Sequence, residues 1–586
     1  MKKFKSIIKR FVSLVKSSYN TVCRKSPYIE PVLIIGGSLL VALLIILPIK
    51  NMSNEDVITI ETNEAEVAFY NNDYEKAIDE YERLQKDDKW PIWEVKIAEI
   101  YSIKGDIEKS NELLKSATLT RNKILYGEEK DKYKDKDGEF INYVVFTYFM
   151  NGEYEEAIDV AEAFVLENGK DKDLMKTLYT IYMVNGKIEK AKEIVDSYDV
   201  DRESAYDLAL LAKMNILVDN WDDGLKLLNE AFNKDNDEVK VYDVINEVAS
   251  YDKGGTITKL TEMSNKNPNE LSYKMFMAKV YSMSQDSSEK ALDIIEKIEN
   301  EDVGNIQVRL IKSDVYKNTG NESDAKEILE EIENVDKNSY SDYYIAGWQS
   351  FESGDYDKAL ELSKKSIIEN RDYPYNYGLL IPEIMRATGN EKLSEGYFRT
   401  ALYAEPFNYN IIIKIADYYA DKSIDNEIAR KYYKLAVGLN PKDAETYYKL
   451  ATLDLVDKKN DSAIEYLNKA ININESEGKY YRALGTAYLN EGEDDKAIES
   501  IRNAYEIDEN DSLTLNNAAY YYIFIEENIE RGMENIKAAY EAINISMDNK
   551  TIVTITENYN KIKTLYDKYN RGEESDMRTS DFILFY

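Results

Sequence analysis

Apolar side chains recur at intervals of three and four residues from about residue 61 to residue 545, in blocks of about a dozen residues. This spacing puts the apolar residues of each block on one face of an α-helix. Short segments that are polar or contain glycine separate the blocks. The pattern therefore predicts a long succession of amphipathic helices joined by tight turns.

The blocks also repeat in pairs with a regular period. Ala429, Ala463 and Ala497 follow one another at steps of 34 residues, and the same step separates Ala325 from Ala359. Gly354 precedes Ala359 by five residues. We expect the glycine to end the first helix of a unit and the alanine to lie where the second helix approaches it closely. A two-helix unit of this size cannot bury its apolar face alone, so neighbouring units are expected to stack into a solenoid with a concave surface.

Two segments show the repeat most clearly, residues 447–476 and 480–511. The second of them resembles the tetratricopeptide repeat family in its small residues, its aromatic position and its period. The matching residues are Gly485, Tyr488, Ala497 and Ala504, with Pro406 and Pro441 at the family's closing proline position. The resemblance implies an all-α helical-hairpin solenoid of about fourteen units over residues 61–545, and a role in binding other proteins.

Three stretches depart from the regular pattern. The units near 235–268 and 375–406 are degenerate, and Pro382 falls inside a predicted first helix, where we expect it to disturb the geometry. The charged segment near 118–140 is interpreted as a loop insertion of about a dozen residues. The period fades after residue 545, so residues 546–586 are predicted to be a capping helix and a tail.

The tail ends in the apolar run FILFY. An apolar run is unusual at an exposed chain end. We expect it to fold back onto the solenoid, and the alternative is that it serves as a peptide for a partner to bind.

Ahead of the repeats, residues 31–49 carry no charge, and thirteen of these nineteen residues are Leu, Ile or Val. A helix of this length spans roughly 28 Å, close to the thickness of the hydrocarbon core of a bilayer. A cleavable signal peptide would need a shorter apolar core and a small-residue cleavage site. The sequence therefore predicts a transmembrane helix over residues 30–50, between a basic amphipathic segment, 1–29, and a linker, 51–60.

The charges on the two sides of this segment differ in sign. Residues 1–50 contain nine Lys or Arg and one acid, Glu30, whereas the remaining chain contains 66 bases and 109 acids. By the positive-inside rule, the N-terminus is predicted to face the cytoplasm and the repeats to lie outside it, on a single-pass protein of the cell membrane. The alternative orientation makes the repeats a cytoplasm-facing adaptor or regulator.

Composition narrows the chemistry further. The 586 residues include no His and a single Cys, Cys23, which removes the usual triads and the histidine-containing zinc sites. The net charge of −35 opposes binding to nucleic acid. We therefore expect that the protein is not an enzyme and that it binds neither a cofactor nor a metal. A carboxylate-based glycan-active enzyme is the remote alternative, and it would need a domain outside the repeats. The Ile, Lys, Asn and Tyr-rich composition suggests a bacterial protein.

Candidate partner-binding residues follow from the concave face, which first helices line in the family that the sequence resembles. Aromatic and Arg side chains are the usual anchors of protein interfaces. Mapping the repeats puts five of them on that face: Tyr344, Trp348, Phe351, Tyr448 and Arg482. Partners are predicted to be other proteins, with basic ones favoured by the acidic charge, and the oligomeric state stays open.

Together these features predict a membrane-anchored, extracytoplasmic scaffold. It would mediate protein–protein interactions in cell-envelope assembly, secretion or surface biogenesis.

Overall fold

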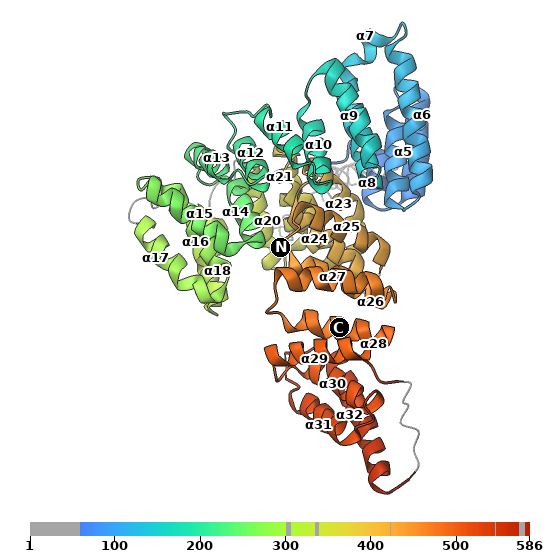
Figure 1. Cartoon of the computed structure of the whole chain (residues 1–586). Coiled ribbons are helices and arrows are strands. Elements are labelled where there is room, and N and C mark those ends of the chain that lie inside the picture. The colour runs from blue at the N-terminus through green and yellow to red at the C-terminus, as the bar shows by residue number, and fades with distance from the viewer. Residues whose placement is uncertain (1–58, 300–305, 334–338, 422–423, 545, 574–580) are drawn as a thin grey trace, which may run out of the picture. The chain divides into compact units, whose positions relative to one another are not determined.

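The computed structural model describes residues 59–586, apart from 300–305, 334–338, 422–423, 545 and 574–580 (Figure 1). Residues 61–586 form one compact unit, distinct from residues 1–60. The predicted transmembrane segment and the basic segment before it lie outside the described residues. Within the described part, no helix combines the length and apolar character needed to cross a membrane.

Every long element in the described part of the chain is a helix, and the helices form fourteen pairs followed by α32 (Asn549–Asn570). This arrangement confirms the predicted all-helical hairpin repeat. The first helices are α3 (Glu64–Tyr70), α5 (Ile92–Ile103), α8 (Asp137–Asn151), α10 (Lys172–Val184), α12 (Ala205–Leu217), α14 (Val239–Tyr251), α16 (Leu271–Ser282), α18 (Ile306–Asn318), α20 (Tyr340–Glu352), α22 (Ile381–Ala387), α24 (Tyr409–Ala420), α26 (Ala444–Val456), α28 (Gly478–Glu491) and α30 (Ser512–Phe524). The second helices are α4 (Tyr74–Asp87), α6 (Ile107–Leu125), α9 (Tyr154–Asn168), α11 (Ile188–Asp196), α13 (Trp221–Lys234), α15 (Lys253–Lys266), α17 (Ser288–Glu299), α19 (Glu322–Glu333), α21 (Tyr356–Glu369), α23 (Ser394–Ala404), α25 (Asn426–Leu439), α27 (Asn460–Ile473), α29 (Asp494–Ile507) and α31 (Ile529–Glu541).

The turn between α20 and α21 shows how the sequence makes one hairpin. Gly354 has a φ of +81°, which a residue with a Cβ adopts only at a cost. Asp355 then accepts a hydrogen bond from the backbone N–H of Lys358 at 3.2 Å and caps α21. Ala359, one turn further on, is fully buried. The predicted roles of the glycine and the alanine are therefore confirmed at this hairpin.

The disturbance expected at Pro382 is present and local. Residues Asn376–Leu380 form a π-helical turn that leads directly into α22, whose first turn contains Pro382. Proline has no N–H to donate to the carbonyl four residues earlier, so the helix widens there instead of continuing with α geometry.

The charged stretch near 118–140 is largely helical, so its interpretation as a loop is wrong. Helix α6 continues to Leu125, and the short helix α7 (Lys130–Tyr133) and a 3-10 turn (Lys134–Lys136) lead into α8. Tyr133 is buried and stacks on Trp90 with ring centroids 5.3 Å apart. The Tyr133 hydroxyl also donates to Asp88 at 3.1 Å, so one buried tyrosine anchors a segment whose charge pattern alone suggested solvent.

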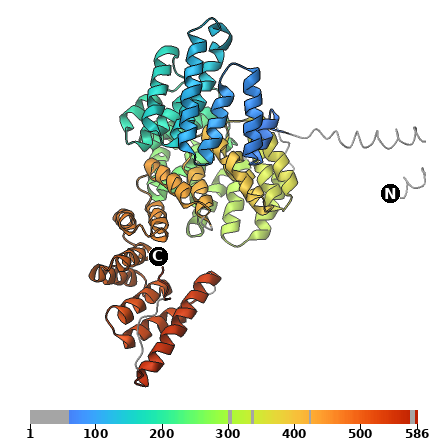
Figure 2. The same ribbon diagram turned by 90° about the vertical axis from the view of Figure 1, so that its right-hand side faces the viewer.

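The first helices α3 to α14 do not leave their inner face open, because residues 371–409 run along it. Figure 2 shows the blue N-terminal helices beside the yellow helices of this segment. Tyr70 on α3 hydrogen-bonds Thr400 at 3.0 Å, and Lys176 on α10 donates to the carbonyl oxygen of Ala404 at 2.8 Å. We call residues 371–409 the internal segment.

A buried ionic cluster joins the internal segment to α12 and α14. Lys213 lies 2.5 Å from Glu247 and 2.6 Å from Glu405, and Lys240 also pairs with Glu405. All four side chains are at most 1% exposed. Burial opposes ionisation of Glu405, but the two lysines outweigh it and lower its pKa.

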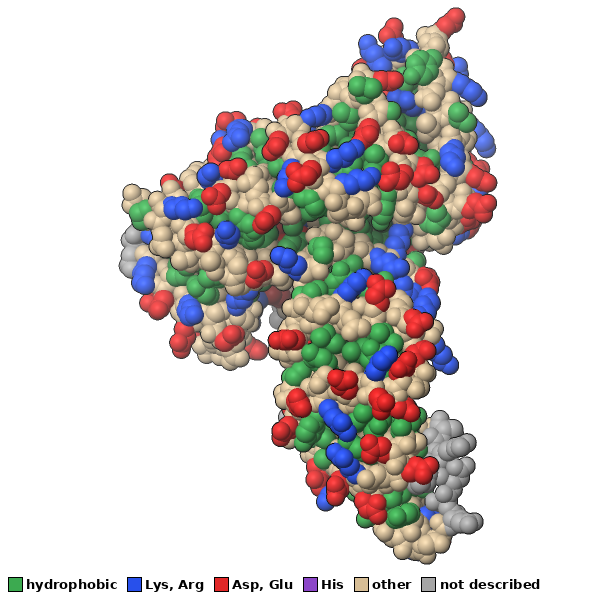
Figure 3. All heavy atoms as spheres, in the orientation of Figure 1, with side chains coloured by type: hydrophobic (Ala, Val, Ile, Leu, Met, Phe, Trp, Pro, Cys, Tyr) green, Lys and Arg blue, Asp and Glu red, His purple; other side chains and the backbone are tan. Residues whose placement is uncertain are grey.

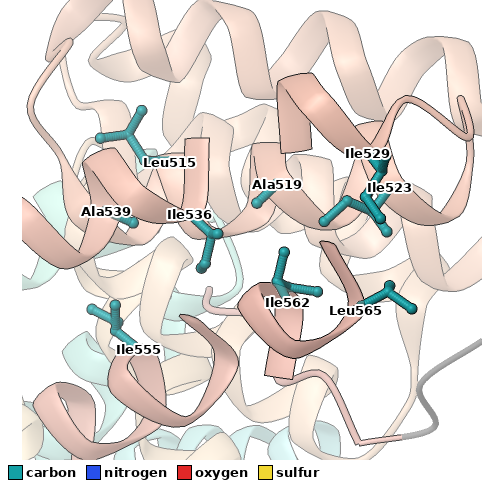
Figure 4. Packing of buried hydrophobic residues seen from close by; sticks show 9 residues of the cluster. All are labelled: Leu515, Ala519, Ile523, Ile529, Ile536, Ala539, Ile555, Ile562 and Leu565. Carbon is teal, nitrogen blue, oxygen red and sulfur yellow. The ribbon is translucent and has the colours of Figure 1, made fainter. Parts of the chain in front are cut away.

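The C-terminal repeats pack in the simpler way that the sequence predicts. Helices α30, α31 and α32 share a cluster of buried aliphatic residues that point toward one another between the helices (Figure 4). Its members are Leu515, Ala519, Ile523, Ile529, Ile536, Ala539, Ile555, Ile562 and Leu565. Helix α32 therefore closes the apolar face of the last pair, as the predicted capping helix should.

Candidate functional site

The three aromatic candidates on α20 form one ladder. The ring centroids of Tyr344 and Trp348 are 6.3 Å apart, and those of Trp348 and Phe351 are 5.5 Å apart. Tyr344 is buried under Tyr373 of the internal segment, at 4.9 Å between ring centroids. Burial raises the pKa of Tyr344 beyond its ordinary value. Tyr344 therefore contributes to the packing between α20 and the internal segment. Its role in partner binding stays a prediction.

Trp348 and Phe351 are the partly exposed members of the ladder. With Tyr344, Trp348 borders a crevice of about 190 Å³ between α14, α18 and α20. Asp243 lines the same crevice, and burial raises the pKa of its carboxyl to about 7. The crevice is too small to hold more than a side chain of a partner.

The other two candidates, Tyr448 and Arg482, lie together in the C-terminal repeats. Arg482 on α28 pairs with Asp511, the residue that caps α30. Tyr448 on α26 packs against Tyr480, with ring centroids 5.3 Å apart. Thr486, which belongs to the feature described next, is one turn beyond Arg482 on the same helix.

Thr486, Asn516, Asn517 and Asn558 form what we call the tail-binding face. They come from three helices, α28, α30 and α32, and all four side chains are at most 3% exposed. Asparagine within a helix costs roughly 0.6 kcal/mol relative to alanine, and a buried amide needs partners. Two consecutive buried asparagines in α30 therefore require an explanation outside their own helix.

The explanation is that the last six residues, 581–586, run across these side chains and use them as hydrogen-bond partners. Ile583 donates its N–H to Oδ1 of Asn558 at 3.3 Å and accepts at its carbonyl oxygen from Nδ2 of the same residue at 2.9 Å. Phe585 makes the same pair of bonds with Asn517, at 2.9 Å and 2.6 Å. Each asparagine amide thus stands in for the peptide group of a neighbouring β-strand.

The remaining polar groups of the face complete this network. Asn516 donates to the carbonyl oxygen of Ile583 at 3.1 Å, and Thr486 donates to that of Phe585 at 2.7 Å. Asn517 also donates to the hydroxyl of Thr486 at 2.9 Å. Every bond from these polar groups to the tail reaches the tail backbone, so the polar groups recognise an extended conformation.

Apolar contacts hold the tail from the side. The ring of Phe582 lies 5.6 Å from that of Tyr520 and 5.8 Å from that of Phe524. Phe582 and Phe585 pack against the aliphatic cluster of α30 to α32, whereas Ile583 and Tyr586 are exposed. The expectation that FILFY folds back onto the solenoid is confirmed.

Sequence reasoning missed the asparagines that make this face. The signal was the pair Asn516-Asn517 within an otherwise apolar first helix, where two poor helix formers need partners.

Paired helices stacked in series, with first helices that hold an extended segment, define a helical-hairpin solenoid of the kind that binds other proteins. The model of the tetratricopeptide repeat matches residues 444–477 and 478–511, which are α26 with α27 and α28 with α29. Residues 444–511 of the chain are therefore two tetratricopeptide repeats. No curated protein matches its sequence.

Several solved structures resemble the chain at low similarity. The APC/C hetero-tetramer Cut9–Hcn1 is 14% identical over 89% of this chain and 98% of that chain, with a TM-score of 0.38. Yeast Tom70 is 16% identical over 82% of this chain and 94% of that chain, with a TM-score of 0.33. MamA is 25% identical over 28% of this chain and 94% of that chain, with a TM-score of 0.26. These scores are too low for a comparison of how the helices are arranged in space.

Proposed function

We propose that the protein is a scaffold that holds other proteins through extended segments, bound to the first helices of its C-terminal repeats. The observation that carries this proposal is the tail-binding face, where Asn517 and Asn558 each satisfy both backbone groups of one bound residue. Recognition of this kind needs a segment of partner chain in extended form and little else.

The place of the scaffold follows from the sequence. The apolar segment 31–49 and the excess of bases before it support a single-pass anchor with the repeats outside the cytoplasm. We therefore propose that it serves cell-envelope assembly, secretion or surface biogenesis. On the face seen in Figure 3, Lys and Arg lie among Asp and Glu and gather in no separate patch, so charge alone selects no partner there.

Photocrosslinking in intact cells tests the scaffold function. A photoreactive amino acid at Tyr520, beside the tail, is expected to capture the same partner reproducibly. The matched position is Tyr505, an exposed tyrosine on the second helix α29. Capture of the same proteins from both positions, or of none from Tyr520, would reject partner binding at this face.

Orientation has its own test, which uses the lone thiol. In a Cys23→Ala background, Ser116→Cys places a thiol at an exposed position of α6. We expect an impermeant maleimide to label it in intact cells and to leave Cys23 of the unmodified chain unlabelled. The opposite labelling would favour the cytoplasm-facing adaptor.

A further inference from the structure

The segment 581–586 occupies a surface that is built to hold an extended chain, and it is part of the same molecule. We infer that this segment is an intramolecular ligand, which an extended apolar segment of a partner protein replaces when the scaffold binds it. This inference rests on the proposed function and adds to it how the face is kept occupied and what chemistry its partner carries.

The contacts show that the tail is held as a ligand and not as part of the core. The bonds run from side chains of three helices to the backbone of Ile583 and Phe585. Lys561 on α32 also donates to the carbonyl oxygen of Asp581 at 2.9 Å. If the tail leaves, water can reach Thr486 and the three asparagines, so no polar group is stranded in an apolar interior.

The side chains of the tail define the partner. Phe582, Leu584 and Phe585 are half-buried, whereas Ile583 and Tyr586 are 49% and 39% exposed. The matching partner segment is uncharged and extended, with an aromatic residue to lie against Tyr520 and Phe524, any residue next, then an aliphatic and a second aromatic residue. The network that pairs with the backbone accepts any sequence that can adopt this conformation.

Tethering makes the tail an effective competitor. A segment joined to its site through a short linker acts at an effective concentration on the order of millimolar. A free peptide with the same contacts therefore meets a face that is already filled. We expect the full chain to bind such a peptide at least about tenfold more weakly than a chain that lacks residues 581–586.

The direct test is fluorescence anisotropy with a labelled peptide of residues 578–586, RTSDFILFY. It is titrated with the full chain in detergent and with the same chain lacking 581–586. The shortened chain is expected to bind and the full chain to bind at least about tenfold more weakly. Equal binding to both, or no binding to a shortened chain whose thermal melt shows it folded, would overturn the inference.

Two matched controls locate the binding. Asn517→Ala in the shortened chain is expected to weaken binding at least about tenfold, whereas Asn535→Ala on the second helix α31 leaves it unchanged. A peptide N-methylated at the positions of Ile583 and Phe585 loses both N–H donors and is expected not to bind. N-methylation at Leu584 keeps both donors and is expected to preserve binding. Tighter binding of the peptide methylated at Ile583 and Phe585 than of the peptide methylated at Leu584 would also overturn the inference.

A second variant covers the case in which the shortened chain does not fold. Phe585→Pro in the full chain removes the N–H that Asn517 accepts while the helices stay intact. It is expected to bind the free peptide more tightly than the unmodified chain does, and unchanged binding would count against exchange. If a partner crosslinks to Tyr520 but the free peptide does not exchange with the tail, only this inference is wrong. If the peptide exchanges but no partner crosslinks to Tyr520, the proposed scaffold function is wrong.

Discussion

The repeats before residue 440 and the repeats after it use the inner faces of their first helices differently. In the first region, α3 to α14 meet the internal segment through buried ion pairs and stacked tyrosines, for example Tyr143 on Tyr403 at 4.5 Å between ring centroids. In the second region, α28, α30 and α32 hold residues 581–586 of the tail. The same helical hairpin therefore makes an interior in one region and a binding surface in the other.

The difference shows that a concave face in a solenoid is not by itself a binding site. What decides its use is whether another part of the chain fills it permanently. The side chains of Lys213, Glu247 and Glu405 in the ionic cluster are at most 1% exposed. Separating these charges would therefore be costly. The tail is held by hydrogen bonds at an accessible edge, each worth roughly 0.5–1.5 kcal/mol net.

Dividing the chain tests this comparison most severely. A fragment of residues 442–586 contains whole repeats that contact mainly their neighbours, so it should melt cooperatively on its own. A fragment of residues 61–333 loses the internal segment and exposes the inner faces of α8, α10 and α12, so it should lose cooperative melting. Circular dichroism melts of both fragments measure this, and equal cooperativity would erase the distinction between the regions.

Removing the shared carboxylate of the ionic cluster should have the next largest effect. Glu405→Gln leaves Lys213 and Lys240 buried with too little negative charge, which is expected to lower the free energy of unfolding by about 3–5 kcal/mol. The control is Glu361→Gln, because Glu361 pairs with Lys365 at the surface and should matter by less than about 0.5 kcal/mol. Urea unfolding followed by tyrosine and tryptophan fluorescence distinguishes the two.

A pH dependence near neutrality should mark the first region alone. Burial raises the pKa of Glu238 to about 7, against hydrogen bonds from Tyr340 and the Lys240 backbone that lower it. Between the unfolded pKa of about 4.3 and this value, the folded state keeps a proton that the unfolded state releases, so stability falls as pH rises through that window.

The substitution Glu238→Gln tests that dependence, because glutamine keeps the acceptor oxygen and cannot ionise. At pH 8 the variant should be more stable than the unmodified chain by about 3–4 kcal/mol, and at pH 4 the two should be alike. Asp243 and Lys431, whose pKa values burial moves to about 7, titrate in both proteins and cancel from the difference between them. Urea midpoints at a series of pH values check it, and parallel curves for the two proteins would contradict the assignment.

The smallest effect is expected at the tail. Phe582→Ala removes a half-buried ring from Tyr520 and Phe524 and should cost about 1 kcal/mol, confined to α30 to α32. Hydrogen exchange should then become faster at the amides of Ile583 and Phe585 while α12 and α14 keep their protection. Faster exchange in α12 and α14 as well would show that the two regions are energetically joined.

Much of the hairpin architecture was predictable because it is local. Gly354 and Ala359 sit five residues apart for reasons that involve only one turn and two helices, and α32 was expected because the last apolar face needs a cover. The charged stretch around Tyr133 was predicted wrongly, since its partner Trp90 lies 43 positions away and no local pattern links them.

The candidate site was predictable only in part. Arg482 lies one helical turn from Thr486 of the tail-binding face, but Tyr344 is covered by Tyr373 of the internal segment. Asn517 and Asn558 were missed because their significance depends on a tail segment that returns 68 residues after the first of them and 25 residues after the second.

By itself, the sequence determined that helices of about a dozen residues stack in pairs, because periodicity, glycine turns and alanine contacts act over a few residues. It also determined the strong charge asymmetry on which the proposed membrane orientation rests. Only the tertiary structure decided which inner faces are filled. That outcome depends on contacts between distant residues, such as the ion pair of Lys213 with Glu405, 192 residues apart. The local sequence pattern of neither segment predicts such a contact.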